Sequence, residues 1–317
     1  MENREIKIVF MGTPLFGAII LKKLSDTPYR PFLVITSPNK PKGRKQVLTL
    51  PAVKLAAKEK NIKIIQPLKI KDSKSEIISL KPDLGVVAAY GKILPKEILD
   101  IPKYGFLNVH PSLLPCWRGA SPIQYTILNG DEKTGISIIK MTEGMDEGPI
   151  VEMSKSKCQM SNINAKELTK KLAELGGDLL AETIPRWVSG KITPQPQNDS
   201  EATYTKIIKK EDGRINWQNS AESIERKIRA FYPWPGAFSF WNKKRIKITE
   251  GKVLKLAENS SLPIPGKVFL GSNKKPAVLA GKDALIIEKI QLEGKKEMSS
   301  KEFLRGHGDF IGSIMEG

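Results

Sequence analysis

The sequence predicts an α/β protein, with a parallel sheet in its N-terminal part and a second, smaller β domain after it. Three observations lead to this prediction. Apolar segments of strand length alternate with segments of helical periodicity over residues 1–189. A stretch rich in Pro and polar residues follows at 190–206 and has the composition of a linker. Short β-like segments separated by Gly and Pro then occupy 207–317, which is typical of a small barrel.

The first domain begins with a buried strand and a helix. Residues 6–11 are mostly apolar and end at the turn Gly12-Thr13-Pro14, after which apolar residues recur at helical spacing over 16–24. Further apolar segments predict strands at 31–36, 63–66, 83–89, 105–110 and 135–140. Helical patterns occur at 53–60, 75–80 and 121–128. Strands that alternate with helices in this way predict a parallel sheet covered on both faces.

A longer amphipathic helix closes this domain. Asn164 is suited to cap its N-terminus, and Glu167 stands at the third helical position. An apolar face is formed by Leu168, Leu172, Leu175 and Leu179. We therefore place the end of the first domain at residue 189.

The second domain is predicted to begin with a helix at 221–230. Short β-like segments follow at 237–241, 245–249, 266–270, 276–279 and 284–292. Their regular spacing, with Gly and Pro between them, predicts a small barrel.

The charge of the chain is strongly positive. The 317 residues include 52 Lys and Arg against 34 Asp and Glu, which gives a formal net charge of +18. Such a chain is attracted to polyanions, including nucleic acids. Only 10 of the 52 cations are Arg, however, so a generally lysine-rich composition explains the charge as well as nucleic-acid binding does. Local clusters of cations have to distinguish these two explanations.

Membrane, export and thiol chemistry are not indicated. No apolar run approaches the ~18 residues of a membrane span. The N-terminus is acidic and leads directly into a strand, unlike an export signal, so we expect a cytoplasmic protein. Cys116 and Cys158 have no metal-ligand spacing, and we expect no metal.

Three polar residues form the candidate catalytic site. Asn108 and His110 stand at the C-terminal end of a predicted strand, where open α/β sheets bind ligands, and alternation places both side chains on one face. Asp146 lies in a Gly-flanked loop further on and could pair with the imidazole. His110 is one of only two histidines, and its ordinary pKa of ~6.5 suits proton transfer near neutrality.

These groups suit the attack of an amine on a carbonyl carbon. Asn108 and His110 would stabilise the tetrahedral intermediate, and His110 and Asp146 would relay the proton. A structural Asn–His pair and a turn-forming Asp fit the same residues, so spacing alone leaves both interpretations open. An NAD-dependent dehydrogenase is a weaker alternative, because Gly12-Thr13-Pro14 lacks the Gly-x-Gly-x-x-Gly fingerprint.

Two segments resemble the signatures of the folate-dependent formyltransferases. They are 108–124, which reads NVHPSLLPCWRGASPIQ, and 145–150, which reads MDEGPI. The resemblance extends over nearly the whole chain and implies a Rossmann-like catalytic domain followed by an OB-like barrel. It also implies formyl transfer from 10-formyltetrahydrofolate, with Asn108, His110 and Asp146 as the catalytic residues.

The resemblance further implies where the folate is bound. The residues expected to contact it are Ser112, Leu113, Leu114 and Pro115. The loop after Ala89, including Tyr90, Gly91 and Ile93, would line the pterin pocket.

The acceptor implied by the resemblance is methionyl-initiator tRNA. The opening 10–16, the basic loop 37–45 and the segment 228–237 of the second domain are similar to the family members that act on this tRNA. The cations expected to bind tRNA are Lys40, Lys42, Arg44 and Lys45. We expect the enzyme to act as a monomer. Leu15, where an acid is common, and Pro111, where Gly also occurs, depart from the family pattern.

The same residues are compatible with two alternative functions. One is formyl transfer to a small amine such as a sugar nucleotide, which the basic loop disfavours. The other is a regulator that binds nucleic acid and senses folate without catalysis, which would bind tRNA but leave it unformylated.

Overall fold

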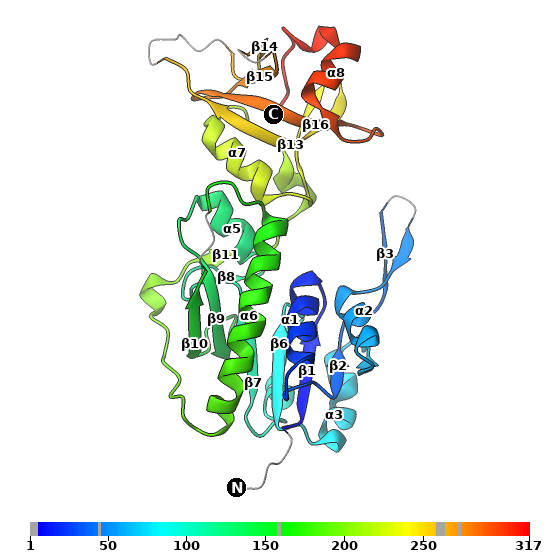
Figure 1. Ribbon diagram of the computed structural model, residues 1–317, viewed down its shortest axis with the longest axis vertical. Coiled ribbons are helices and arrows are strands. Elements are labelled where there is room, and N and C mark those ends of the chain that lie inside the picture. The colour runs from blue at the N-terminus through cyan, green and yellow to red at the C-terminus, as the bar shows by residue number, and fades with distance from the viewer. Residues whose placement is uncertain (1–5, 44–45, 157–159, 258–263, 272–273) are drawn as a thin grey trace. The chain divides into compact units, whose positions relative to one another are not determined.

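The computed structural model of the chain describes residues 6–43, 46–156, 160–257, 264–271 and 274–317. The chain divides into two compact units (Figure 1). The first unit comprises Met1–Pro122, Lys133–Cys158 and Leu168–Lys206. The second comprises Ile123–Glu132, Gln159–Glu167 and Ile207–Gly317.

A seven-stranded sheet forms the centre of the first unit. Its strand order is β10-β9-β7-β6-β1-β2-β5. The strands are β1 (Ile8–Gly12), β2 (Leu33–Ile35), β5 (Lys63–Ile65), β6 (Leu84–Ala88), β7 (Phe106–His110), β9 (Gly135–Lys140) and β10 (Ile150–Lys155). From β5 to β7 neighbouring strands are parallel, which confirms the predicted sheet.

The sheet differs from the prediction at one edge. Strand β9 runs antiparallel to β7, and β10, which the sequence pattern did not predict, runs antiparallel to β9. The connection from β7 to β9 passes through β8 (Arg118–Gly119) and α5 (Pro122–Asn129). It brings the chain back at the edge where β7 ends, so β9 runs in the opposite direction.

Helices cover both faces of this sheet. They are α1 (Leu15–Ser25), α2 (Ala52–Glu59), α3 (Lys74–Leu80), α4 (Lys96–Leu99) and α6 (Ala165–Val188). Helix α6 lies against the face that carries Val109, beside Gly176 (Figure 1). On the opposite face, Ile77 of α3 and Ile98 of α4 pack in one apolar cluster with Phe106 of β7. Because side chains alternate along β7, Asn108 and His110 share the face of Phe106.

Two small strand pairs complete the first unit. Strands β3 (Lys40–Lys42) and β4 (Val47–Thr49) form an antiparallel hairpin, and β8 pairs in parallel with β11 (Tyr204–Thr205). Short 3₁₀ helices occur at Ile70–Ser73 and Asp199–Glu201 here, and at Lys210–Gly213 and Gly308–Phe310 in the second unit. Residues 190–206, which were expected to form a linker, all belong to the first unit, which ends at Lys206.

The second unit contains the curled antiparallel sheet that the barrel prediction implied. Its strand order is β12-β13-β16-β15-β14, and β17 pairs with β16. The strands are β12 (Ala237–Trp241), β13 (Lys244–Leu254), β14 (Val268–Leu270), β15 (Pro276–Leu279), β16 (Ala284–Leu292) and β17 (Met298–Ser299). Helices α7 (Ala221–Ala230) and α8 (Ser300–Gly306) pack on it, the latter not predicted. Among the core side chains, Trp241 packs edge-on against Phe303 and Phe310.

The last residues of the chain bridge the two edges of this curled sheet. Phe240 of β12 and Glu316 exchange two backbone hydrogen bonds, of 3.0 and 3.2 Å. Val268 of β14 donates to the carbonyl of Ser313 at 2.9 Å and accepts from Gly312 at 2.9 Å. In the part of the chain that the structure describes, no helix is long and apolar enough to cross a membrane.

Candidate active site

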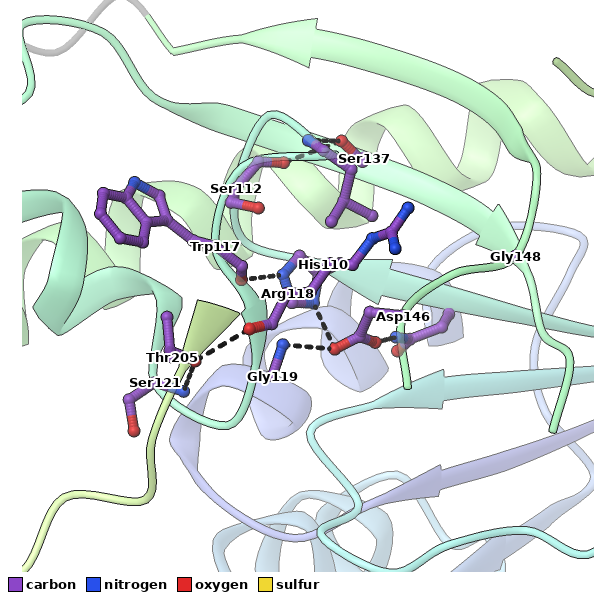
Figure 2. Close-up of polar contacts among 12 residues, drawn as sticks. His110, Ser112, Trp117, Arg118, Gly119, Ser121, Ser137, Asp146, Gly148 and Thr205 are labelled. Carbon is purple, nitrogen blue, oxygen red and sulfur yellow. Dashed lines mark hydrogen bonds and ion pairs between the residues drawn. The ribbon is translucent and has the colours of Figure 1, made fainter. Parts of the chain in front are cut away.

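The three side chains predicted for catalysis meet beside strand β7. Asn108 Nδ2 donates a hydrogen bond of 3.1 Å to Asp146 Oδ1. His110 Nδ1 lies 3.6 Å from Asp146 Oδ2, and its ring is only 4% exposed (Figure 2). The carboxylate of Asp146 therefore lies against both the carboxamide of Asn108 and the imidazole of His110.

Asp146 reaches this position from the opposite edge of the sheet. Strand β9 ends at Lys140, which pairs with Leu107 near the start of β7. The loop that follows β9 then folds back, so that Asp146 meets Asn108. Its backbone is left-handed, with φ of 55°, which costs roughly 1 kcal/mol for a residue other than glycine. Asp146 Oδ2 also accepts a 2.9 Å hydrogen bond from the backbone N–H of Gly119, so both carboxylate oxygens are engaged.

A backbone carbonyl holds the imidazole in place. His110 Nε2 lies 3.0 Å from the carbonyl oxygen of Trp117 (Figure 2). Because a carbonyl oxygen only accepts hydrogen bonds, Nε2 must carry the hydrogen. Nδ1, which faces Asp146, is thus the nitrogen that can exchange a proton.

The segment 112–115, expected to contact folate, is tied to the neighbouring strand. Ser112 Oγ donates to the carbonyl of Cys116 at 2.6 Å. The backbone N–H of Leu114 donates to Ser137 Oγ at 3.0 Å, and that hydroxyl donates to the carbonyl of Ser112 at 2.8 Å. The side chains of Ser112 and Leu114 are buried. The half-buried members are Leu113 and Pro115.

Tyr90 lies in the loop after β6, which the resemblance assigns to the pterin pocket. Its side chain is buried, and burial raises the pKa of its phenol to about 12. Among the described residues its hydroxyl has no hydrogen-bond partner, although buried polar groups normally have one. Ile93, three residues further on, is 80% exposed. The loop therefore offers one buried polar atom and one exposed apolar side chain.

The basic segment forms a hairpin rather than an irregular loop. Strands β3 and β4 pair with Lys40 opposite Thr49, and Lys40 is exposed. Lys42 is the last residue of β3, whereas Arg44 and Lys45 lie outside the described residues. The hairpin stands out from the sheet of the first unit (Figure 1).

Polar contacts fix the base of this hairpin. Asn39 Oδ1 accepts a 3.1 Å hydrogen bond from Lys54 Nζ and a 3.2 Å bond from Gln66 Nε2. Gln66 Nε2 also donates to the carbonyl of Ser37 at 2.6 Å. Because Lys54 lies on α2 and Gln66 follows β5, the hairpin is attached to the framework of the sheet.

Sequence reasoning missed a segment that runs back along the site, residues 195–205, here called the returning segment. It carries β11, which pairs with β8. The guanidinium of Arg118 on β8 is only 1% exposed and forms a 2.7 Å ion pair with Asp199 of the returning segment. Arg118 stood within the motif at 108–124, but a Pro-rich polar composition gives no local signal for such pairing.

Of the two cysteines, Cys116 is exposed, and Cys158 lies outside the described residues.

Comparison with known protein families gives two matches that together span most of the chain. Residues 6–184 match the family described as formyl transferase. Residues 207–308 match the family described as formyl transferase, C-terminal domain.

Similar proteins carry related names. The methionyl-tRNA formyltransferase of Caldanaerobacter subterraneus is 41% identical over 314 residues, which cover 98% of this chain and 100% of the relative. The structure of methionyl-tRNA formyltransferase from Clostridium thermocellum is similar with a TM-score of 0.55 at 20% identity, covering 89% of this chain and 99% of that one.

A third similarity is to HypX from Aquifex aeolicus, solved in complex with tetrahydrofolic acid. Its TM-score is 0.63 at 16% identity, over 99% of this chain, which spans about half (49%) of HypX. At such identity the two structural similarities show the fold alone. The family match over residues 6–184 and the 41% identity along the whole chain show more: the chain belongs to the formyl transferase family.

Proposed function

We propose that the chain transfers the formyl group of 10-formyltetrahydrofolate to the α-amino group of methionyl-initiator tRNA, giving N-formylmethionyl-tRNA for translation initiation. One observation carries the proposal: the carboxylate of Asp146 contacts Asn108, His110 and the N–H of Gly119 together. The names of relatives about 40% identical along the whole chain support the same acceptor. Because translation initiation takes place in the cytoplasm, we propose that the enzyme acts there.

The proposed mechanism needs no nucleophilic side chain. The amine nitrogen of the acceptor attacks the formyl carbon directly, and negative charge develops on the formyl oxygen. One N–H of the Asn108 amide is bonded to Asp146, and the other would donate to that oxygen. His110 Nδ1 would take the proton that the attacking amine releases, while Asp146 stabilises the charge this creates. Collapse of the tetrahedral intermediate would then break the bond between the formyl carbon and N10 of the folate. The imidazolium of His110 would return the proton to N10, so that tetrahydrofolate leaves as a neutral amine.

The folate would be held mainly by the loop after β6 and by the segment 112–115. The buried hydroxyl of Tyr90, which has no partner among the residues that the structure describes, suits a polar atom of the pterin. The exposed side chain of Ile93 suits an apolar surface. Ser112 and Leu114 are buried, so this segment would contact the ligand through backbone atoms and its half-buried side chains. When bound, 10-formyltetrahydrofolate supplies the one-carbon group.

The acceptor tRNA would contact cations of both units. In the first unit, the proposed contacts are Lys40 and Lys42 of β3, together with Arg44 and Lys45, which lie outside the described residues. In the second, Lys243 and Lys244 lie at the start of β13 with exposed side chains, which suits contact with phosphates. We propose that residues 1–189 carry the catalytic groups and the hairpin cations, and that 207–317 contribute the other contacts to tRNA. Residues 190–206 connect the two domains and include the returning segment. We propose that the enzyme acts as a monomer.

Charge reversal in the hairpin should weaken tRNA binding. Lys40→Glu with Lys42→Glu is expected to lower the affinity for tRNA and to flatten its salt dependence, by roughly 0.7–0.9 in the slope of log K against log salt for each lost phosphate contact. Filter binding over a range of salt concentrations measures both. The matched control reverses Lys81 and Lys103, two exposed residues just before β6 and β7. Equal slopes for the two double variants would contradict the role of the hairpin.

The activity itself is tested with charged initiator tRNA and 10-formyltetrahydrofolate, followed by mass analysis of the aminoacyl product. We expect a gain of one formyl group on methionine. An amino-sugar nucleotide is offered in a parallel reaction. Formylation of the sugar alone, or tRNA binding without formylation, would refute the proposed function.

A further inference from the structure

Gln197 of the returning segment connects the two loops that hold the catalytic groups. Its Nε2 donates to the backbone carbonyls of Asp146 and Gly148, each at 2.7 Å. Its Oε1 accepts a 3.0 Å hydrogen bond from Nε of Arg118. Carbonyl oxygens only accept and guanidinium nitrogens only donate, so the orientation of this amide is fixed by its partners.

The first of these loops needs such support. Asp146 holds a left-handed backbone, and Gly148 lies so close to the end of β9 that a Cβ there would stand 1.9 Å from the carbonyl oxygen of Lys140. Strained backbone of this kind persists only where the surroundings hold it. By bonding the carbonyls on either side of Glu147, the Gln197 amide keeps the Asp146 carboxylate directed at Asn108 and His110.

The second loop supplies the backbone groups of the site. It carries the carbonyl of Trp117 that holds His110 and the N–H of Gly119 that donates to Asp146. The returning segment fixes it as well. Thr203 Oγ1 accepts a 2.8 Å hydrogen bond from the N–H of Trp117. Gly119 has φ of 111°, and a Cβ there would lie 2.7 Å from the carbonyl oxygen of Thr205.

We propose that Gln197 is a positioning residue for formyl transfer, which keeps Asp146 in register with His110 by bonding the 146–148 loop to Arg118. This inference rests on the proposed function. Displacement of a catalytic group by about 1 Å can lower a rate by ~10²-fold while substrate binding is largely retained. We therefore expect loss of the Gln197 side chain to lower kcat and to leave KM nearly unchanged.

The test measures steady-state kinetics of the full chain with both substrates, normalised to the folded fraction by circular dichroism. Gln197→Ala and Gln197→Glu are both expected to lower kcat by about 10- to 100-fold, with KM changed by less than about twofold. Glutamate keeps the acceptor for Arg118 but presents an oxygen to the carbonyls of Asp146 and Gly148. Comparison of Gln197→Glu with the wild type therefore isolates the bonds to the 146–148 loop, and the difference between the two variants reports the bond to Arg118.

Gln195→Ala is the matched control on the same segment. Within the described part of the chain, its side chain donates only to the nearby carbonyl of Thr193, at 3.1 Å, and its backbone bonds to Ile150 survive the substitution. A Gln197→Glu enzyme with near-normal kcat, or a Gln197→Ala enzyme with only a raised KM, would overturn the inference. A wild-type chain that formylates no tRNA would instead refute the proposed function, so the two failures are distinguishable.

Discussion

Replacement of His110 by alanine is expected to lower kcat by about 10²–10⁴-fold, the usual contribution of a positioned acid or base. The imidazole is 4% exposed, with Nε2 held by the carbonyl of Trp117 and Nδ1 facing Asp146. A water molecule that enters the space left by the imidazole would not be held by these two contacts, so it would not replace the positioned base. Single-turnover formylation of methionyl-tRNA measures the effect directly.

The second histidine provides the control for this experiment. The ring of His307 packs on Phe303 in the second unit, with centroids 4.5 Å apart. His307→Ala should cost some stability but leave kcat close to that of the wild type. Comparable activity of the His110 and His307 variants would remove His110 from the mechanism.

Asp146→Asn is expected to lower kcat by about 10²-fold or more. The carboxylate accepts from Asn108 through one oxygen and from the N–H of Gly119 through the other. An asparagine offers a single acceptor oxygen, so one of these donors would face an NH₂ group. The negative charge opposite His110 is lost as well.

The neighbouring acid makes a matched control. Glu147→Gln removes one charge from an exposed side chain of the same loop and should be nearly neutral. Because residues that act as a unit are not additive, the double variant of His110→Ala and Asp146→Asn should be little slower than the slower single variant. Fully multiplicative losses would contradict a shared proton path.

The sequence was most informative where local pattern and tertiary environment agree. Strand β7 is buried on both faces. Because side chains alternate along a strand, Asn108 and His110 lie on the same face, and their proximity could be predicted from the strand alone. The seven-strand sheet was predicted less completely. Nothing in the apolar run at 135–140 reveals strand direction, which depends on where the chain re-enters the sheet.

Contacts made at long range could not be read from composition. The sequence predicted that Asp146 could pair with His110, but it did not reveal the route. Because β9 runs antiparallel to β7, Asp146 comes from the other edge of the sheet through a loop that folds back. Gln197 and Asp199 stand among Pro and polar residues. Such a composition is typical of a linker, and it gives no sign of whether these side chains contact the rest of the domain. Their importance depends on a buried guanidinium some eighty positions earlier, Arg118.

The chain's final residues have a consequence for behaviour at high concentration. Sheet edges with unsatisfied backbone groups recruit strands from other molecules and so start aggregation. Here Phe240 and Val268, one on each edge strand of the curled sheet, already exchange hydrogen bonds with residues 312–316. A foreign strand would have to displace this intramolecular cover before it could add to either side.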